Sequence, residues 1–245
     1  MKISQEEKLR NEKVILETAS QMMAEKSFSE VSLRDISIQA GLSQATAYKY
    51  FKTKENMIFR FFELIQDECR EKLTEIPDFG NYHLEEQIQI LLETQLEILE
   101  KNRSFVSQIL HDALNLDFFQ SAQGFAPVRE KYESMIHDLL QAAIEAGEIS
   151  KPPVYGFVLR SFWDLYVFVL IYWIKDHSSH YTNTTQLIEK ILGVSKALLQ
   201  SQVLSKTSDL FHFVIKEHVF SLLDKMMKKK STPVEKKSPF EKEPS

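Results

Sequence analysis

Apolar residues recur along most of the chain at spacings of three and four, which places them on one face of an α-helix. The alternation of apolar and polar residues that marks strands is absent, and six glycines and seven prolines are too few for a loop-rich fold. The pattern therefore predicts an all-α protein. Single helices are expected over roughly 5–26, 84–101, 104–115, 127–147, 153–176, 184–204 and 207–227, and three more between 32 and 76.

Capping residues mark the ends of the three helices between 32 and 76. Ser32 and Asp35 have the spacing of a capping box, and Gly41 can adopt the left-handed conformation that ends a helix. Ser43 starts a short third helix, and Thr53 starts a fourth. Two short helices joined by a tight turn have the layout of a helix-turn-helix, whose second helix enters the major groove of DNA.

The helices group into a small head and a larger body. The fourth helix carries an apolar stripe formed by Ile58, Phe62, Ile65, Cys69 and Leu73, and Pro77 in the segment PDFGNYH marks a boundary after it. The expected domains are a helix-turn-helix head (1–53), a linking helix (54–76), a helical body (77–205), an extra C-terminal helix (206–228) and a disordered lysine-rich tail (229–245).

The net charge is distributed unevenly between these parts. The whole chain carries −5, but residues 1–54 hold nine Lys and Arg against seven Asp and Glu. That segment therefore carries +2, and the remainder carries −7. A positive head on an acidic body would let only the head approach the phosphates of a nucleic acid.

The most apolar segment, VYGFVLRSFWDLYVFVLIYWI, is long enough to span a membrane. It contains Arg160 and Asp164, four residues apart on one helical face, and each charge would cost about 2.5 to 3.5 kcal/mol or more in lipid. The segment is therefore interpreted as a helix buried in a bundle or at a subunit interface, and no contact with a membrane is expected.

The short helix after Ser43 has the residue types of a DNA-reading helix. Its exposed N-terminal side chains suit base edges, where glutamine pairs with adenine and threonine offers a hydroxyl and a methyl group, and they are Ser43, Gln44 and Thr46. Groups suited to phosphate follow at Tyr48, Tyr50 and Lys54. The N-terminus of the fourth helix would attract the same phosphate as Lys54. Two amphipathic helices joined by glycine can also be ordinary packing, but an inert helix has little use for two tyrosines beside lysines on a solvated face.

The stretch SLRDISIQAGLSQATAYKYFKTKENM, residues 32–57, resembles the DNA-binding signature of the TetR/AcrR family of bacterial transcriptional regulators. The shared features are a capped helix, an Ala-Gly-hydrophobic-Ser turn, a Tyr-x-x-Phe recognition helix and a following Lys-Glu. The resemblance implies that Arg34, Gln44, Thr46 and Lys49 face bases or nearby phosphates, and that Ser32, Tyr48, Tyr50 and Lys54 contact the DNA backbone. The chain departs from the family at two positions. Ser27 stands where the family usually has glycine, and Ala45 stands where glycine or proline is common. Neither departure removes a contact group.

The resemblance also implies a body that binds a small molecule and dimerises through its last two helices, here about 153–176 and 184–204. Aromatic residues crowd this half of the chain. Each one alone suits core packing, but together they suggest a cavity for an apolar or aromatic ligand, with candidate lining residues Phe105, Ile109, Phe162, Trp163 and Tyr166. The candidate dimer stripe consists of Leu187, Ile191, Val194 and Leu198.

Catalytic and metal-binding patterns are absent from the sequence. The histidines at His177, His180, His212 and His218 lack the spacing of a metal site, and neither a nucleophile–base pattern nor a phosphate-cradling glycine loop occurs. We therefore expect no metal, no cofactor and no enzymatic activity. The polar start MKISQEEKLRNEK differs from a signal peptide, and the single cysteine cannot form an internal disulfide, so a cytoplasmic location is expected.

These observations favour a ligand-responsive DNA-binding regulator, and a repressor rather than an activator. The expected partners are a palindromic double-stranded operator, a small-molecule effector and a second copy of the chain. The alternative is a helical small-molecule carrier or protein-interaction module that does not read a specific operator.

Overall fold

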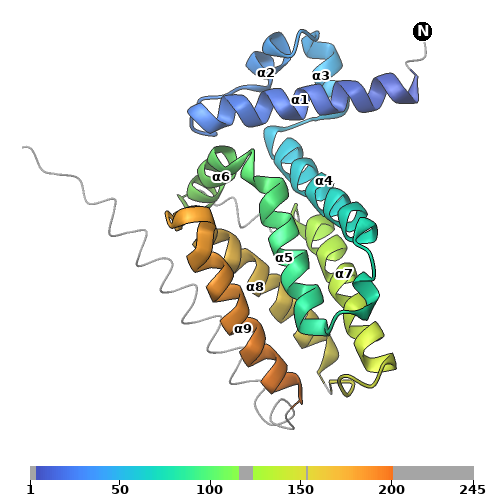
Figure 1. The fold of residues 1–245 in the computed structure, drawn as a ribbon. Helices are drawn as coiled ribbons and strands as arrows, with labels where there is room; N and C mark the ends of the chain where they lie inside the picture. The colour runs from blue at the N-terminus through green and yellow to red at the C-terminus, as the bar shows by residue number, and fades with distance from the viewer. Residues whose placement is uncertain (1–3, 116–123, 153, 201–245) are drawn as a thin grey trace, which may run out of the picture. The chain divides into compact units, whose positions relative to one another are not determined.

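The computed structural model describes residues 4–115, 124–152 and 154–200, and every regular element within these ranges is helical. The α-helices are α1 (Gln5–Glu25), α2 (Leu33–Gln39), α3 (Gln44–Tyr50), α4 (Lys54–Glu75), α5 (Leu84–Glu100), α6 (Arg103–Asn115), α7 (Ala126–Glu145), α8 (Tyr155–Lys175) and α9 (Thr182–Gln200) (Figure 1). Two short 3-10 turns, η1 (Phe79–Asn81) and η3 (Ser179–Tyr181), precede α5 and α9. The predicted all-α fold is confirmed. The expected helix over 207–227, the extra-helix domain at 206–228 and the lysine-rich tail lie outside the described residues.

The head forms as its capping residues predict. The Ser32 side chain accepts a hydrogen bond from the backbone N–H of Asp35, whose carboxylate accepts from the N–H of Ser32, and both distances are 3.1 Å. These bonds satisfy N–H groups that the first turn of α2 would otherwise leave unpaired. Gly41 then takes a φ of 68°, a conformation that other residues rarely adopt, and Ser43 caps α3. The turn between α2 and α3 therefore depends on glycine for its backbone conformation.

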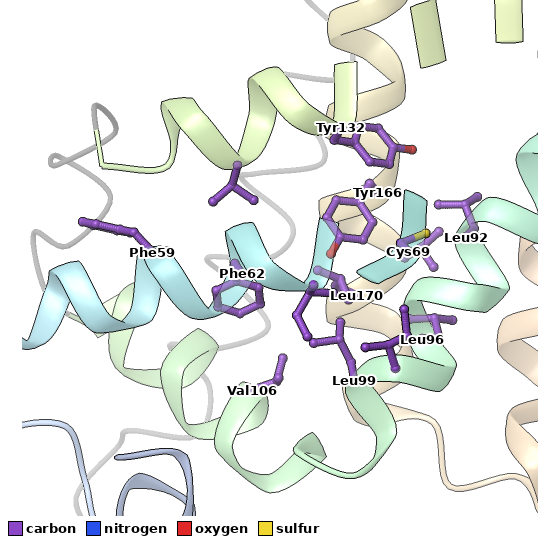
Figure 2. Packing of buried hydrophobic residues seen from close by; sticks show 14 of the residues in the cluster. Phe59, Phe62, Cys69, Leu92, Leu96, Leu99, Val106, Tyr132, Tyr166 and Leu170 are labelled. Carbon is purple, nitrogen blue, oxygen red and sulfur yellow. The ribbon is translucent and has the colours of Figure 1, made fainter. Parts of the chain in front are cut away.

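Helix α4 is the longest described helix, and it contacts both the head and the body. Its predicted apolar stripe is buried at every position, namely Ile58, Phe62, Ile65, Cys69 and Leu73. Helix α4 packs on α1 near its start and on α5 and α7 along its length, where Phe62 and Cys69 lie among the core side chains in Figure 2. Because residues 4–200 all fall within one compact unit, the division into head, linking helix and body stays a prediction.

An arginine and an aspartate hold the helix ends together at one end of the body. Arg103, the first residue of α6, donates from Nη2 to the carbonyl oxygens of Trp173, Ile174 and Asp176, each at 2.9 Å. It thereby pairs carbonyls that the end of α8 would leave without partners. The buried Asp176 carboxylate accepts from the backbone N–H groups of Ser178 and Thr184, both at 2.9 Å. Burial raises the pKa of Asp176, but the hydrogen bonds from Ser178 and Thr184 outweigh it and hold the pKa well below its usual value.

Helix α8 is the only described helix whose length and composition would allow it to cross a membrane. It packs against α6, α7 and α9, and 39% of its most apolar window is buried. One such helix is weak evidence for a span, because the core helices of globular proteins have the same composition. The apolar residues that α8 leaves partly exposed include Tyr172, so this helix retains surface available for a partner.

Candidate nucleic-acid interface and body interior

Helix α3 presents its N-terminal half and one flank to solvent. Ala47 is fully buried against the head, which fixes the rotation of the helix, and Gln44, Tyr48 and Lys49 are exposed. The hydroxyls of Ser43 and Thr46 lie 2.8 Å apart, and the Ser43 oxygen also accepts from the backbone N–H of Thr46. The helix therefore exposes an amide, a phenol and an ammonium to solvent, and their contact with DNA stays a prediction.

Arg34 and the candidate backbone-contacting residues differ in how far their side chains are already engaged within the chain. Arg34 on α2 is exposed, and Tyr48 is 46% exposed. Ser32 is exposed as well, although its hydroxyl already takes part in the capping box. The half-buried Tyr50 accepts a 3.3 Å hydrogen bond from the side-chain amide of Asn11 on α1. Arg34 and Tyr48 thus have the greatest freedom to meet a ligand.

Lys54 faces inward, which sequence reasoning did not foresee. Its ammonium donates a hydrogen bond to the backbone carbonyl of Phe28 and lies 4.2 Å from the centre of the Phe28 ring. Burial lowers the pKa of Lys54, and the nearby Glu55 raises it. The first residue of α4 is therefore tied to the loop between α1 and α2.

The two departures from the family pattern cause no strain. Ser27 is not among the described non-glycine residues with positive φ, which are Asp78, His180 and Tyr181. Its backbone N–H and hydroxyl donate to Glu30 at 2.9 and 2.7 Å, so a hydrogen-bonded turn forms without glycine. Ala45 is exposed near the start of α3 and leaves the helix intact.

The five candidate ligand-pocket residues separate into different parts of the body. The Trp163 ring lies beside those of Tyr132 and Tyr166. Tyr132 of α7 stacks on Tyr166 at a centroid distance of 4.8 Å, and Figure 2 shows these two tyrosines. Phe105 packs edge-on against Phe61, and Ile109 is buried on α6. Phe162 lines a cavity of about 20 Å³ beside α5 and α9. The structure brings two of the five together, and their lining of a shared pocket stays a prediction.

A second cavity lies among α1, α6 and the C-terminal ends of α5 and α8. It has a volume of about 580 Å³ and a mainly polar lining, formed by Ala24, Glu100, Lys101, Arg103, Ser104, Ser107, Gln108, Ile174, His177 and Tyr181. Arg103 and Tyr181 also hold the ends of α6 and α8 together, since Tyr181 donates to Glu100 at 2.6 Å and Arg103 caps α8. These lining residues therefore already have structural roles.

Buried polar residues form a group that the sequence did not single out. Gln66 on α4 and Gln95 on α5 are both buried, and the Gln95 amide donates to the Gln66 oxygen at 2.7 Å. Gln66 in turn donates to the Tyr166 hydroxyl at 3.4 Å. Gln95 stands three residues after Leu92 and four before Leu99 in the apolar stripe of α5. A polar residue within an apolar stripe is a sequence signal that could have identified Gln95 as a buried polar side chain.

Three of the candidate dimer residues, Leu187, Ile191 and Val194, have side chains on α9 that the body does not cover completely. Ile188 and Leu192 are buried against the body, whereas Leu187 and Ile191 are half-buried and Val194 is 60% exposed. The side chain of Leu198 lies outside the described residues. Helix α9 thus keeps an apolar surface that its own body does not cover, and the role of this surface in dimerisation stays a prediction.

Metal binding finds no support in the part of the chain that the structure describes. No group of three or more His, Cys, Asp or Glu side chains is placed there so that it could hold a metal ion.

Two family models match this chain. The model described as bacterial regulatory proteins of the tetR family matches residues 15–61, and the model described as the tetracyclin repressor-like C-terminal domain matches residues 87–214. The chain is also similar to the fatty acid metabolism regulator protein of Bacillus subtilis (strain 168). The two are 23% identical over 147 residues, which cover 56% of this chain and 70% of the relative.

Solved structures share the fold. The transcriptional regulator FadR from Bacillus subtilis in complex with stearoyl-CoA is 17% identical with a TM-score of 0.58, covering 73% of this chain and 96% of that one. The FadR transcriptional repressor from Thermus thermophilus in complex with lauroyl-CoA is 18% identical with a TM-score of 0.55, covering 75% and 92%. Identities this low establish a common fold, and they do not transfer a ligand to this chain.

The position of Lys54 predicts a role in head stability. We expect Lys54→Met to destabilise the chain by about 1 kcal/mol, because it removes a charged hydrogen bond and a cation–π contact at a partly exposed site. Thermal melting should show a midpoint lowered by about 2 to 4 °C. The exposed Lys52 provides the control, since Lys52→Met removes the same charge without such a contact. Equal midpoints for the two variants would contradict the anchoring role.

Proposed function

The chain belongs to the tetR family of bacterial regulatory proteins, and we propose that it represses transcription by binding a palindromic operator as a homodimer and releasing it when an apolar-chain effector enters the body. The observation that carries this proposal is α3, a short capped helix with a buried Ala47 and with Gln44, Tyr48 and Lys49 exposed. Such a helix fits the major groove, where exposed N-terminal residues reach base edges.

The proposed DNA contacts are those that the sequence predicted, and the exposure of Gln44, Tyr48 and Lys49 supports them. Gln44 and Thr46 would read bases together with Ser43, and Arg34 and Lys49 would face bases or nearby phosphates. Backbone contacts are assigned to Ser32, Tyr48, Tyr50 and Lys54. An ammonium has three N–H donors, so Lys54 can bind a phosphate while it keeps its bond to Phe28.

A homodimer is proposed because one recognition helix is too small to select a site alone. A helix of seven residues touches few base pairs, whereas two heads on a twofold axis multiply the discrimination and require an inverted repeat. The uncovered apolar surfaces of α8 and α9, which include Tyr172 and Val194, supply the proposed interface. Its other members are the predicted residues Leu187, Ile191 and Leu198.

The effector class is proposed from both the body and the relatives. The core of the body is apolar and rich in aromatic side chains, among them Trp163, Tyr166 and Tyr132, which suits an apolar chain. Regulators with the same fold are known with stearoyl-CoA and lauroyl-CoA bound. A long-chain acyl thioester is therefore the effector that we propose, and it acts by binding more tightly to the conformation that has low affinity for DNA.

The base-reading role of α3 predicts a specific loss of discrimination. We expect Gln44→Ala or Thr46→Ala to weaken binding to the operator by about 1 to 3 kcal/mol and to change binding to random DNA little. Lys49→Ala serves as the comparison: if Lys49 contacts a phosphate, its loss weakens binding to both DNAs and reduces the salt slope by about one unit, and if it contacts a base, its loss weakens the operator alone. Fluorescence anisotropy on both DNAs at several salt concentrations measures these effects, and an equal loss on both DNAs for Gln44→Ala would remove it from base reading.

The proposed interface predicts a monomeric variant. Val194→Glu should give monomers that lose specific operator binding although the head is unchanged, because a charge would be buried at the twofold contact. Light scattering at micromolar concentration measures the assembly, and Gln186→Glu on the same helix is the control for added charge at an exposed polar site. A dimeric Val194→Glu protein, or a monomeric wild type, would contradict the interface.

The proposed function is tested with the DNA upstream of the chain's own gene. Binding of this DNA should weaken when lauroyl-CoA is added below its micelle concentration, and the melting temperature of the protein should rise, because the two equilibria are linked. Free CoA is the control for binding through the nucleotide part of lauroyl-CoA, and it should change neither DNA binding nor the melting temperature. A helical carrier without operator binding would instead show the thermal shift with no specific DNA complex at all, and that result would reject the repressor.

A further inference from the structure

Four buried polar side chains from four helices meet inside the body. They are Gln66 of α4, Gln95 of α5, Tyr132 of α7 and Tyr166 of α8, and we call them the polar cluster. None is more than 2% exposed. Two hydrogen bonds connect three of them, from Gln95 to Gln66 at 2.7 Å and from Gln66 to Tyr166 at 3.4 Å. Tyr132 joins the group by stacking on Tyr166, with Cys69 nearby (Figure 2).

Two atoms of the polar cluster lack a hydrogen-bond partner among the residues that the structure describes. They are the side-chain oxygen of Gln95 and the hydroxyl of Tyr132, and both are fully buried. Leaving a buried polar group unpaired costs about 1 to 3 kcal/mol, and folded proteins pair the great majority of such groups. The cost of two unpaired groups in one cluster points to a hydrogen-bonding partner that the described residues do not supply.

The polar cluster defines the chemistry of that missing group. Burial raises the pKa of Tyr132 well above its usual value, so its hydroxyl stays protonated and can donate. The Gln95 oxygen needs a donor. A matching group must therefore both accept and donate a hydrogen bond. It must also be neutral, because the cluster contains no Lys, Arg or His, and a buried carboxylate without a counter-charge is strongly disfavoured.

We propose that the polar cluster binds a neutral amide-like group at the end of an apolar chain and rejects the corresponding free carboxylate. This inference rests on the proposed function, since it specifies which part of the effector the body recognises. An acyl-CoA carries a thioester carbonyl and amide N–H groups and so offers both kinds of hydrogen bond, whereas a free fatty acid is ionised at neutral pH and can only accept. Recognition therefore distinguishes the activated acyl chain from the free acid.

The aromatic side chains beside the polar cluster supply an apolar wall for the attached chain. The Trp163 ring lies 5.9 Å from that of Tyr132 and 5.6 Å from that of Tyr166. Because the cluster is closed to solvent and one of its members stands on α4, entry of a ligand must separate α4 from the helices that face it. The same recognition event would thus displace the helix that leads to the head.

The test compares two probes that differ only in their polar end, decanamide and decanoate, at pH 8. On the full-length chain, decanamide should raise the melting temperature and bind at least tenfold more tightly by calorimetry than decanoate. Tyr132→Phe should abolish this preference while it keeps the ring stack. Its own melting temperature should stay the same or rise, because an unpaired hydroxyl has been removed. Tyr82→Phe, which removes an exposed hydroxyl just after η1, should keep the preference.

Several results would overturn the inference. These are equal affinity for the two probes, no binding of either probe, and a preference for decanamide that survives Tyr132→Phe. If Tyr132→Phe does not fold, Gln95→Met gives the same test from the other unpaired atom. Operator binding without ligand is measured separately on the same preparations. If the chain releases its operator with lauroyl-CoA but binds the two probes equally, the proposed function stands and this inference is wrong. If the chain prefers decanamide but binds no operator, this inference stands and the proposed function is wrong.

Discussion

The continuous burial of one face of α4 is the constraint on which the described structure depends. This helix has 22 residues and spans about 33 Å, and its stripe from Ile58 to Leu73 is buried throughout. That stripe belongs to a single hydrophobic cluster of the described residues, which also takes in buried side chains of α1, α5, α7 and α8. A rigid helix packed into one continuous core cannot shift at one end without disturbing the packing at the other.

Polar contacts on the flanks of α4 are weaker than this packing. Arg60 donates to Glu12 of α1 at 2.8 Å, Lys131 of α7 donates to Asp67 at 2.6 Å, and Arg70 donates to Asp138 of α7 at 2.9 Å. All these side chains are partly exposed, and ion pairs of this kind contribute little net stability. They can break and re-form as the helix shifts, so the apolar stripe sets the cost of moving α4 while the ion pairs tune its position.

Local features of this fold could be predicted from sequence, and features that depend on helix orientation could not. Ser32, Gly41 and Ser43 act within one turn of the chain, so the ends of α2 and α3 followed from residue chemistry alone. The anchoring of Lys54 depends instead on the position of a loop 26 residues earlier. The polar cluster depends on the rotation of four helices about their axes, which periodicity in one helix cannot reveal. For the same reason, the sequence could supply the aromatic candidates for a pocket, but it could not show that they belong to separate packing groups.

The single cysteine of the chain is placed where oxidants and electrophiles do not reach it. Cys69 is fully buried beside the polar cluster, and burial raises the pKa of its thiol to about 12. The thiolate is the reactive form of cysteine, so this side chain is chemically silent at physiological pH in the closed body. Modification of Cys69 by a thiol reagent therefore requires the helices around it to part, and its rate reports how often the interior of the body opens.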